Sequence, residues 1–244
     1  MKMAESVKPY HQDQNKKSQV ATMFDKIAGK YDLLNKVLSL GIDRSWRKKA
    51  ILQLQDLQPK VVLDVATGTA DVAILTMDLL SPEKVIGIDI SKQMLEYGKP
   101  KILSKGYENR IFLELGDSEN LRFEDNSFDA VTVAFGVRNF EDLDLGLKEI
   151  FRVLKPGGRL VVLEFSKPTI FPFKQIYNFY FRYILPMIGR LTSKDTRAYT
   201  YLYESVQAFP DGSLFLNHLE KQGFCNNKYQ TLTLGICTIY QGNK

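Results

Sequence analysis

Three aspartates lie at the ends of predicted strands, where their side chains could contact a ligand. Asp64 lies in an apolar run before a small-residue turn, Asp89 ends the next apolar run, and Asp117 follows a third. A carboxylate at Asp89 can accept both hydroxyls of a ribose diol, and an acceptor at Asp117 can take the exocyclic amine of adenine. Each aspartate alone is typical of a helix cap or a turn. Three in order at the carboxyl edge of a parallel sheet indicate a site for an adenosine-containing ligand.

The turn after the first strand indicates the kind of ligand. A dinucleotide site requires G-x-G-x-x-G, whose third glycine brings a helix N-terminus close to a pyrophosphate. Residues 66–71 read ATGTAD, with Gly68 inside the turn and Asp71 at the third-glycine position. A carboxylate there is compatible with the helix dipole but would repel a phosphate. Asp64 and Asp71 therefore favour a phosphate-free, cationic cofactor, S-adenosylmethionine (SAM).

Strands and helices that would position these residues alternate along the chain. Continuous apolar runs, typical of parallel strands buried on both faces, cover residues 61–65, 84–89, 128–135 and 159–165. A shorter strand is predicted at 111–114, and helices are predicted to begin at residues 71, 91 and 144. Residues 229–233 and 237–240 predict a β-hairpin. We therefore expect a Rossmann-like α/β fold: a mostly parallel seven-stranded sheet with a C-terminal antiparallel hairpin and a helical cap.

The rest of the chain divides into a tail, a cap and an aromatic insertion. Residues 1–18 are predicted to be a disordered tail, and residues 19–55 a helical cap with helices near 20–40 and 45–54. The main domain spans 56–244 and includes an aromatic insertion at 167–209. This insertion is interpreted either as an amphipathic helical layer or as the entry for a large apolar substrate that rests on a membrane surface, and the two are compatible.

Composition excludes few partners. The 44% hydrophobic and 25% charged residues are ordinary for one globular domain of 244 residues. The net charge of +5 permits an anionic partner, but the basic residues are scattered, so no nucleic acid is expected. No apolar run is long enough to span a bilayer, and the polar start is not a secretory signal. Cys225 and Cys237 are expected to be buried thiols, which favours the cytoplasm, with contact to the inner face of the cell membrane left open.

Three segments together resemble one family. The stretch from Arg152 to Ser166, beginning RVLKPGG, resembles a pattern of the UbiE/MenG quinone C-methyltransferases, which are class I SAM-dependent enzymes. FGVRN at 135–139 and YDLLN at 31–35 are similar to two further patterns of that family. The resemblance covers about residues 20 to 242. The chain departs from the family pattern at Leu34, Asp43 and Ala70.

The resemblance implies both a cofactor site and an acceptor. Cofactor contacts fall on Thr69, Asp89, Asp117 and Ser118. The implied reaction transfers a methyl group to a ring carbon of a polyprenyl hydroquinone, with demethylmenaquinol favoured over a ubiquinone-pathway benzoquinol. No metal is expected, because no cluster of ligands has metal-binding spacing. His218 is expected to be structural.

Catalysis is predicted to depend on Arg138, Asn139 and Tyr31. The ring carbon becomes a better nucleophile as a hydroxyl loses its proton, so the enzyme aligns the reactants and assists deprotonation. Arginine is a poor proton acceptor, so Arg138 is expected to hold the developing phenolate. Tyr31 or Asp32 could complete a proton relay. The alternative for Arg138 is a surface salt bridge with an acid of the next turn, Glu141 or Asp142.

Four other functions remain open on sequence alone. One is a SAM methyltransferase for a different small molecule. A nucleic-acid methyltransferase is disfavoured, because FGVRN stands where amino-methylating DNA enzymes usually carry D/N-P-P-Y/F. An NAD-dependent oxidoreductase is disfavoured by Asp71. The fourth is a non-catalytic SAM-binding protein. The oligomeric state has no signature in the sequence.

Overall fold

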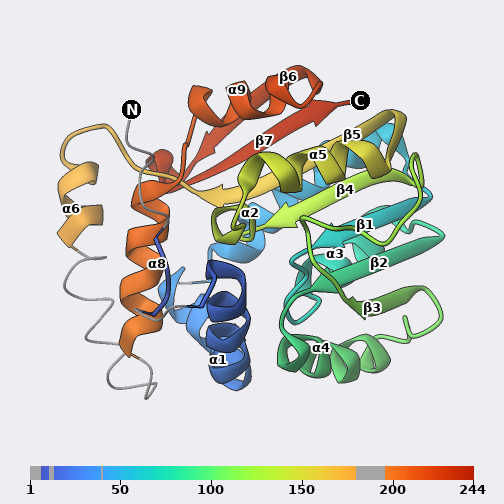
Figure 1. The fold of residues 1–244 in the computed structure, drawn as a ribbon, viewed down its shortest axis with the longest axis horizontal. Helices are drawn as coiled ribbons and strands as arrows, with labels where there is room; N and C mark the ends of the chain where they lie inside the picture. Colours follow the sequence, from blue (N-terminus) through green and yellow to red (C-terminus); the bar gives the residue numbers. More distant parts are fainter. Residues whose placement is uncertain (1–6, 11–13, 40, 180–195) are drawn as a thin grey trace.

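The computed structural model describes residues 7–10, 14–39, 41–179 and 196–244, and within them seven strands form one sheet (Figure 1). The strand order is β3-β2-β1-β4-β5-β7-β6. Strands β1 to β5 pair in parallel, whereas β7 is antiparallel to both β5 and β6. The predicted fold is therefore confirmed. The strands are β1 (Val61–Val65), β2 (Lys84–Asp89), β3 (Ile111–Leu115), β4 (Phe128–Ala134), β5 (Leu154–Phe165), β6 (Cys225–Leu232) and β7 (Cys237–Asn243).

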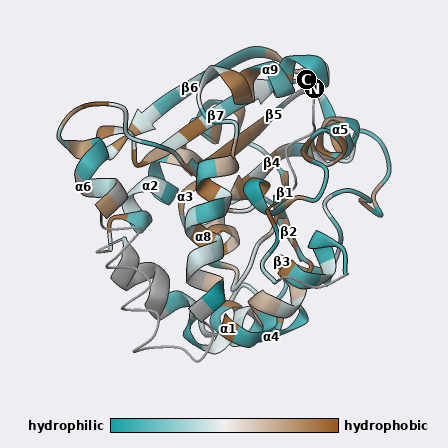
Figure 2. Cartoon of the chain, turned by 60° about the vertical axis from the view of Figure 1, so that its left-hand side comes forward, coloured by the Kyte–Doolittle hydropathy of each residue, from teal (hydrophilic) through white to brown (hydrophobic). Residues whose placement is uncertain are grey.

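The central strands are apolar throughout because both of their faces are covered. Val62 packs in one hydrophobic cluster and its neighbour Leu63 in the other, as expected from the two-residue period of a strand. One cluster includes residues of α5 (Leu143–Val153) and α9 (Ser213–Lys221). The other includes residues of α2 (Asp43–Ile51), α3 (Asp71–Leu80) and α4 (Lys92–Ser104). Figure 2 shows the hydrophobic residues concentrated on the central strands between these layers.

The parallel strands end on the side of the sheet where the helical cap lies. In Figure 1 the arrowheads of β4 and β5 point toward this side, where α1 (Lys16–Leu38) and α8 (Thr196–Ala208) lie. The two helices pack through Val20 and Met23 against Ala198 and Tyr201. Within the described residues, the remaining helices are α6 (Phe173–Phe179) and the short 3-10 segments η1 (Leu52–Leu57), η2 (Val137–Asn139) and η4 (Thr233–Gly235).

Several local predictions hold, and some boundaries move. Strands β1 and β2 have the predicted limits, and the hydroxyl of Ser91 caps α4 by accepting from the Met94 N–H at 3.2 Å. The predicted tail is too long by three residues, because α1 already begins at Lys16. Strand β5 begins at Leu154 rather than at 159. Residues 180–195 of the aromatic insertion lie outside the described residues.

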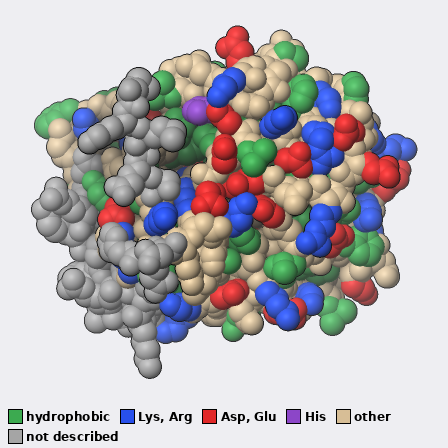
Figure 3. All heavy atoms as spheres, in the orientation of Figure 1, with side chains coloured by type: hydrophobic (Ala, Val, Ile, Leu, Met, Phe, Trp, Pro, Cys, Tyr) green, Lys and Arg blue, Asp and Glu red, His purple; other side chains and the backbone are tan. Residues whose placement is uncertain are grey.

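Charges of both signs are interspersed on the surface in Figure 3. Among the described residues, no helix is long and apolar enough to cross a membrane. Cys237 is buried as expected, but Cys225 is exposed because it lies on the edge strand β6. His218 is structural, with Nδ1 2.6 Å from Oδ1 of Asp144.

Candidate cofactor and acceptor site

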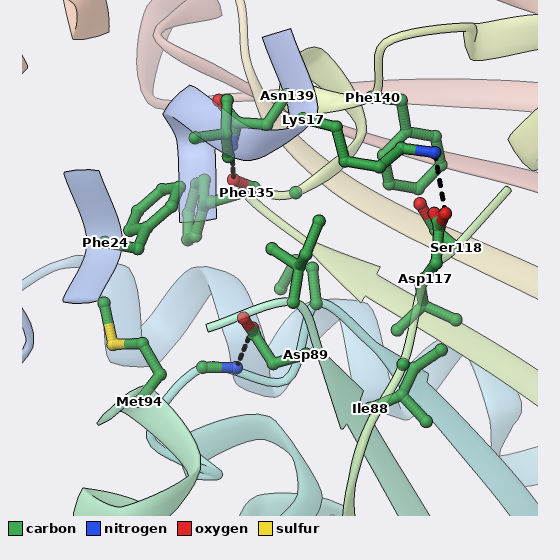
Figure 4. Close-up of a pocket in the computed structure, with 18 of the residues that line it drawn as sticks. Lys17, Phe24, Ile88, Asp89, Met94, Asp117, Ser118, Phe135, Asn139 and Phe140 are labelled. Carbon is green, nitrogen blue, oxygen red and sulfur yellow. Dashed lines mark hydrogen bonds and ion pairs between the residues drawn. The ribbon is translucent and has the colours of Figure 1, made fainter. Parts of the chain in front are cut away.

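A pocket that encloses about 670 Å³, including space open to solvent, lies at the carboxyl edge of the sheet, between the strand-end loops and α1 (Figure 4). Of the nine predicted site residues, six line it: Tyr31, Gly68, Asp89, Asp117, Ser118 and Asn139. The loops after β1, β2, β3 and β4 form the base, and α1 contributes the opposite wall. The helix supplies Lys17, Val20, Phe24 and Tyr31. Their spacing of three, four and seven residues places them on one helical face.

Asp89 is held at the end of β2 by backbone groups. The Gly68 N–H donates to Oδ2 and the Ser91 N–H to Oδ1, each at 2.8 Å. Burial raises the pKa of Asp89 to about 6. Each oxygen keeps a further acceptor position, so the carboxylate can still receive two hydroxyls. Gly68 has a φ of +57°, which favours glycine, whereas a Cβ there would lie 3.8 Å from the Tyr31 ring in an ordinary contact.

Asp117 has a partner that the sequence reasoning missed. The Lys17 ammonium donates to its Oδ2 at 2.7 Å, and Lys17 also lies 3.0 Å from Oε2 of Glu119 (Figure 4). The Glu119 N–H donates to Oδ1 at 2.9 Å. Lys17 falls within residues 1–18, which the sequence predicts to be a tail. The signal was its helical spacing to Val20 and Phe24.

Asp64 and Thr69 lie outside the pocket lining. Both oxygens of Asp64 accept threonine hydroxyls at 2.6 Å, from Thr67 and Thr132, and burial raises its pKa to about 6. Asp64 therefore stabilises the turn through these hydrogen bonds, outside the pocket lining. The Thr69 hydroxyl donates to Asp32 at 2.6 Å, which ties the turn to α1.

Asp71 does not face the pocket either. Its carboxylate pairs with Arg47 at 3.0 Å and with Lys101. The negative charge that was expected from Asp71 comes instead from other side chains of the lining. Three carboxylates, Asp89, Asp117 and Glu119, face this pocket together with one ammonium. This charge set fits a cationic ligand without phosphates, which is the chemistry of SAM.

Helix α1 bonds to the loops that follow each of the first four strands. Lys16 donates to the Phe140 carbonyl at 2.6 Å, after β4, and Lys17 bonds to Asp117, after β3. Asp25 accepts from the Ser91 hydroxyl at 2.6 Å, after β2, and Asp32 accepts from Thr69, after β1. Burial lowers the pKa of Lys16 to about 8. These bonds fix α1 over the pocket.

Arg138 is buried beside the pocket rather than within its lining. Its Nη1 donates to the Phe135 carbonyl at 2.6 Å and to Oε1 of Glu164 at 2.5 Å. The predicted alternative partners, Glu141 and Asp142, are therefore wrong. Sequence spacing favours a partner three or four positions away, whereas Glu164 comes from the neighbouring strand β5.

Asn139 and Tyr31 approach the pocket from different elements. Asn139 follows Arg138 in η2, and its Oδ1 accepts the Tyr201 hydroxyl of α8 at 3.2 Å. The Tyr31 ring contacts Phe24 edge to face, with centroids 5.9 Å apart. Asp43 pairs with Arg47 at 3.0 Å and is structural, and the side chain of Leu34 lies outside the described residues. The described part of the chain contains no cluster of three potential metal ligands.

Comparisons with known proteins agree over nearly the whole chain. The model of the ubiE/COQ5 methyltransferase family matches residues 12–244. A demethylmenaquinone methyltransferase of Bacteroides fragilis is 50% identical over 240 residues, covering 98% of each chain. The ubiquinone/menaquinone biosynthesis C-methyltransferase UbiE of Geotalea daltonii is 47% identical over 230 residues, covering 94% of this chain and 97% of its own.

Solved structures share the fold at lower identity. A SAM-dependent methyltransferase of Thermotoga maritima, described as a possible histamine N-methyltransferase, superposes with a TM-score of 0.64 at 20% identity, covering 92% of this chain and 99% of its own. A putative SAM-dependent methyltransferase of Methanococcus maripaludis gives 0.60 at 19% identity, covering 96% and 97%. With its fold, its acidic pocket and its near full-length relatives, the chain belongs to the ubiE/COQ5 methyltransferase family of SAM-dependent enzymes.

Proposed function

We propose that this protein methylates a ring carbon of demethylmenaquinol, using SAM as the methyl donor. The observation that carries the proposal is the 50% identity over 98% of both chains to a protein named demethylmenaquinone methyltransferase. A second such protein, from Porphyromonas gingivalis, is 45% identical over 245 residues. The acidic pocket supports the choice of donor independently of these names.

In the proposed complex, two of the three carboxylates of the pocket bind the nucleoside. Asp89 accepts the ribose hydroxyls with its remaining lone pairs, and Asp117 accepts the adenine amine. The backbone at Gly68 allows the ligand to approach the turn closely. Asp64 and Thr69 act through the turn, because their own side chains are bonded away from the pocket.

The acceptor ring would lie beside η2. SAM supplies a methyl group that its sulfonium charge has already activated. The protein aligns the ring carbon for in-line displacement and stabilises the phenolate that forms as the hydroxyl loses its proton. Arg138 supplies charge-assisted hydrogen bonds, and Asn139 and Tyr31 orient the ring from opposite sides of the pocket. Asn139 is itself oriented by Tyr201.

The apolar tail of the substrate requires an apolar entry. The segment around α6 exposes large hydrophobic side chains: Ile170 is 60%, Phe171 77% and Phe179 58% exposed. We propose that this segment rests on the membrane surface that holds the quinol. Phe173 and Tyr177 of the predicted aromatic insertion also lie here, but Tyr177 is buried, and residues 180–195 of the insertion fall outside the described range.

Liposome co-sedimentation tests the membrane contact. The triple variant Ile170→Ser, Phe171→Ser, Phe179→Ser should bind vesicles at least about fivefold more weakly than the wild type, because it removes apolar surface that would enter the lipid. The matched control changes exposed Leu103 and Leu214 to Ser on other elements. Equal binding by the triple variant and the wild type would exclude α6 as the contact.

A ubiquinone-pathway benzoquinol is the second candidate acceptor, because the Geotalea daltonii relative is named for both pathways. Mass spectrometry of cellular quinones after deletion of the gene separates the two. We expect accumulation of a demethylated menaquinone precursor. Accumulation of a demethylated ubiquinone precursor would favour the benzoquinol, and unchanged quinones would reject both acceptors.

A further inference from the structure

We propose that Glu164 is a positioning residue for the methyl transfer: it holds Arg138 through Nη1 and leaves the Nε–H of the guanidinium for the oxygen of the acceptor. The inference rests on the proposed function, because Glu164 contacts Arg138, the residue that is proposed to bind the phenolate. Glu164 is fully buried at the end of β5, and its Oε1 lies 2.5 Å from Nη1.

The carboxylate of Glu164 is itself fixed in place. Its Oε1 also accepts the Phe165 N–H at 2.8 Å, and Oε2 lies 3.4 Å from the Arg138 N–H. The Phe135 carbonyl accepts from Nη1 as well. A planar guanidinium that is held by one nitrogen between two fixed oxygens has little freedom to rotate, so the direction of its other N–H groups is determined.

One of those N–H groups lacks a partner. The Arg138 side chain is only 6% exposed, yet its buried Nε has no hydrogen-bond partner among the described residues. A buried, unpaired donor on a charged group is costly, and such donors are rare in native structures. The next residue, Asn139, already lines the cofactor pocket. The structure therefore leaves an unpaired charge-assisted donor on the residue next to the pocket lining, close to where the ring oxygen is proposed to lie.

A purely stabilising role explains the pair less well. Replacing a buried ion pair by apolar side chains is often neutral or stabilising, so burial of Arg138 and Glu164 is weak evidence for a contribution to stability. The charge of Arg138 also affects the pKa values of ionisable side chains around it. Burial raises the pKa of the phenols of Tyr177 and Tyr201 above their usual range, and the charge of Arg138 opposes that rise. Burial raises the pKa of the Cys237 thiol of β7, the charge of Glu164 adds to that rise and the charge of Arg138 opposes it.

The first test is Glu164→Gln, which keeps the shape of the side chain but removes its charge. We expect kcat to fall about tenfold, because the guanidinium loses its charge-assisted anchor. The dissociation constant for SAM and the KM for the quinol should change less than about twofold. A folded Glu164→Gln protein with the kcat of the wild type would reject the proposal.

A double-mutant cycle separates positioning from an independent contribution. If Glu164 acts through Arg138, Glu164→Gln should change kcat less than about twofold in an Arg138→Met background. An equal tenfold loss in both backgrounds would show that Glu164 does not act through Arg138. A loss of stability alone would lower the melting temperature without this non-additivity.

Arg138→Lys provides a second variant if Glu164→Gln does not fold. Lysine keeps the positive charge for Glu164 but has no Nε–H fork, so the protein should fold and its kcat should fall at least about tenfold. Full activity of Arg138→Lys would contradict the assigned use of Nε.

All kcat measurements use the quinol that the wild-type protein methylates. If the proposed acceptor is wrong, the wild type itself shows it by methylating another quinol. If the proposed role of Glu164 is wrong, only the kcat ratios between variants show it. A wild type that methylates no quinol would contradict both.

Discussion

The two halves of the carboxyl edge hold their buried acids in different ways. In the half formed by β1 and β2, neutral donors hold the carboxylates: threonine hydroxyls hold Asp64, and backbone N–H groups hold Asp89. In the half formed by β4 and β5, a guanidinium holds Glu164. Neutral donors leave the negative charge uncompensated, which suits a cationic cofactor. The ion pair cancels the charge, which suits a neutral acceptor that becomes anionic only during the reaction.

The largest expected effect is at Asp89. Asp89→Ala removes both proposed ribose contacts and the anchor of the Gly68 N–H, so SAM should bind about 100-fold more weakly or worse, since hydrogen bonds to a charged group contribute about 1.5–3 kcal/mol each. Isothermal titration gives the dissociation constant. The exposed Asp56→Ala, which loses an ion pair with Arg159 outside the pocket lining, is the control. Normal SAM affinity in Asp89→Ala would remove this carboxylate from the cofactor site.

Arg138→Ala should act on the other half alone. We expect turnover to fall at least about tenfold with little change in SAM affinity, because the guanidinium would stabilise the phenolate rather than the cofactor. Removing it also leaves Glu164 unpaired, which should lower the free energy of unfolding by about 3–5 kcal/mol. Steady-state kinetics and thermal unfolding measure the two effects. Turnover equal to that of the wild type would place Arg138 outside the reaction.

The cofactor half should bind SAM in a pH-dependent way because of Asp89. With a pKa of about 6, Asp89 is charged only above that pH, so SAM affinity should fall by up to tenfold per pH unit as the pH drops below about 6. The raised pKa of Asp89 affects the free energy of unfolding in the opposite direction from SAM affinity. The stability that protonated Asp89 contributes is fully present below about pH 4 and is lost as the pH rises through 6. Titrations at several pH values test the binding effect, which should be absent in Asp89→Asn.

Lys17 is the exception on the cofactor half, and its effect should be the smallest. Lys17→Met leaves three carboxylates facing the pocket without an ammonium, so SAM should bind about two- to threefold more tightly at low salt. The gain should shrink at high salt, because screening weakens partly exposed charges. Lys26→Met, on the same helix but away from the pocket lining, is the control. Weaker binding by Lys17→Met would mean that the ammonium supports the cofactor site.

The sequence predicts the cofactor half better than the acceptor half, and the reason is local. Strands β1 and β2 are continuous apolar runs with an acid at a fixed offset, so Asp89 can be placed without knowledge of other elements. The partner of Arg138 depends on which strand lies beside β4 and in which register, and neither follows from spacing. Lys17 was missed for a related reason, because its partner Asp117 lies 100 residues away.

The position of α1 also has a consequence for how the protein is made. The ribosome synthesises this helix before its partners, because its polar partners follow β1 to β4 and its apolar partners Ala198 and Tyr201 follow β5. Such non-local contacts form late, because the intervening chain must be ordered first. The wall of the pocket that α1 provides should therefore close in the last step of folding, and the ability to bind SAM would report that the chain has finished folding.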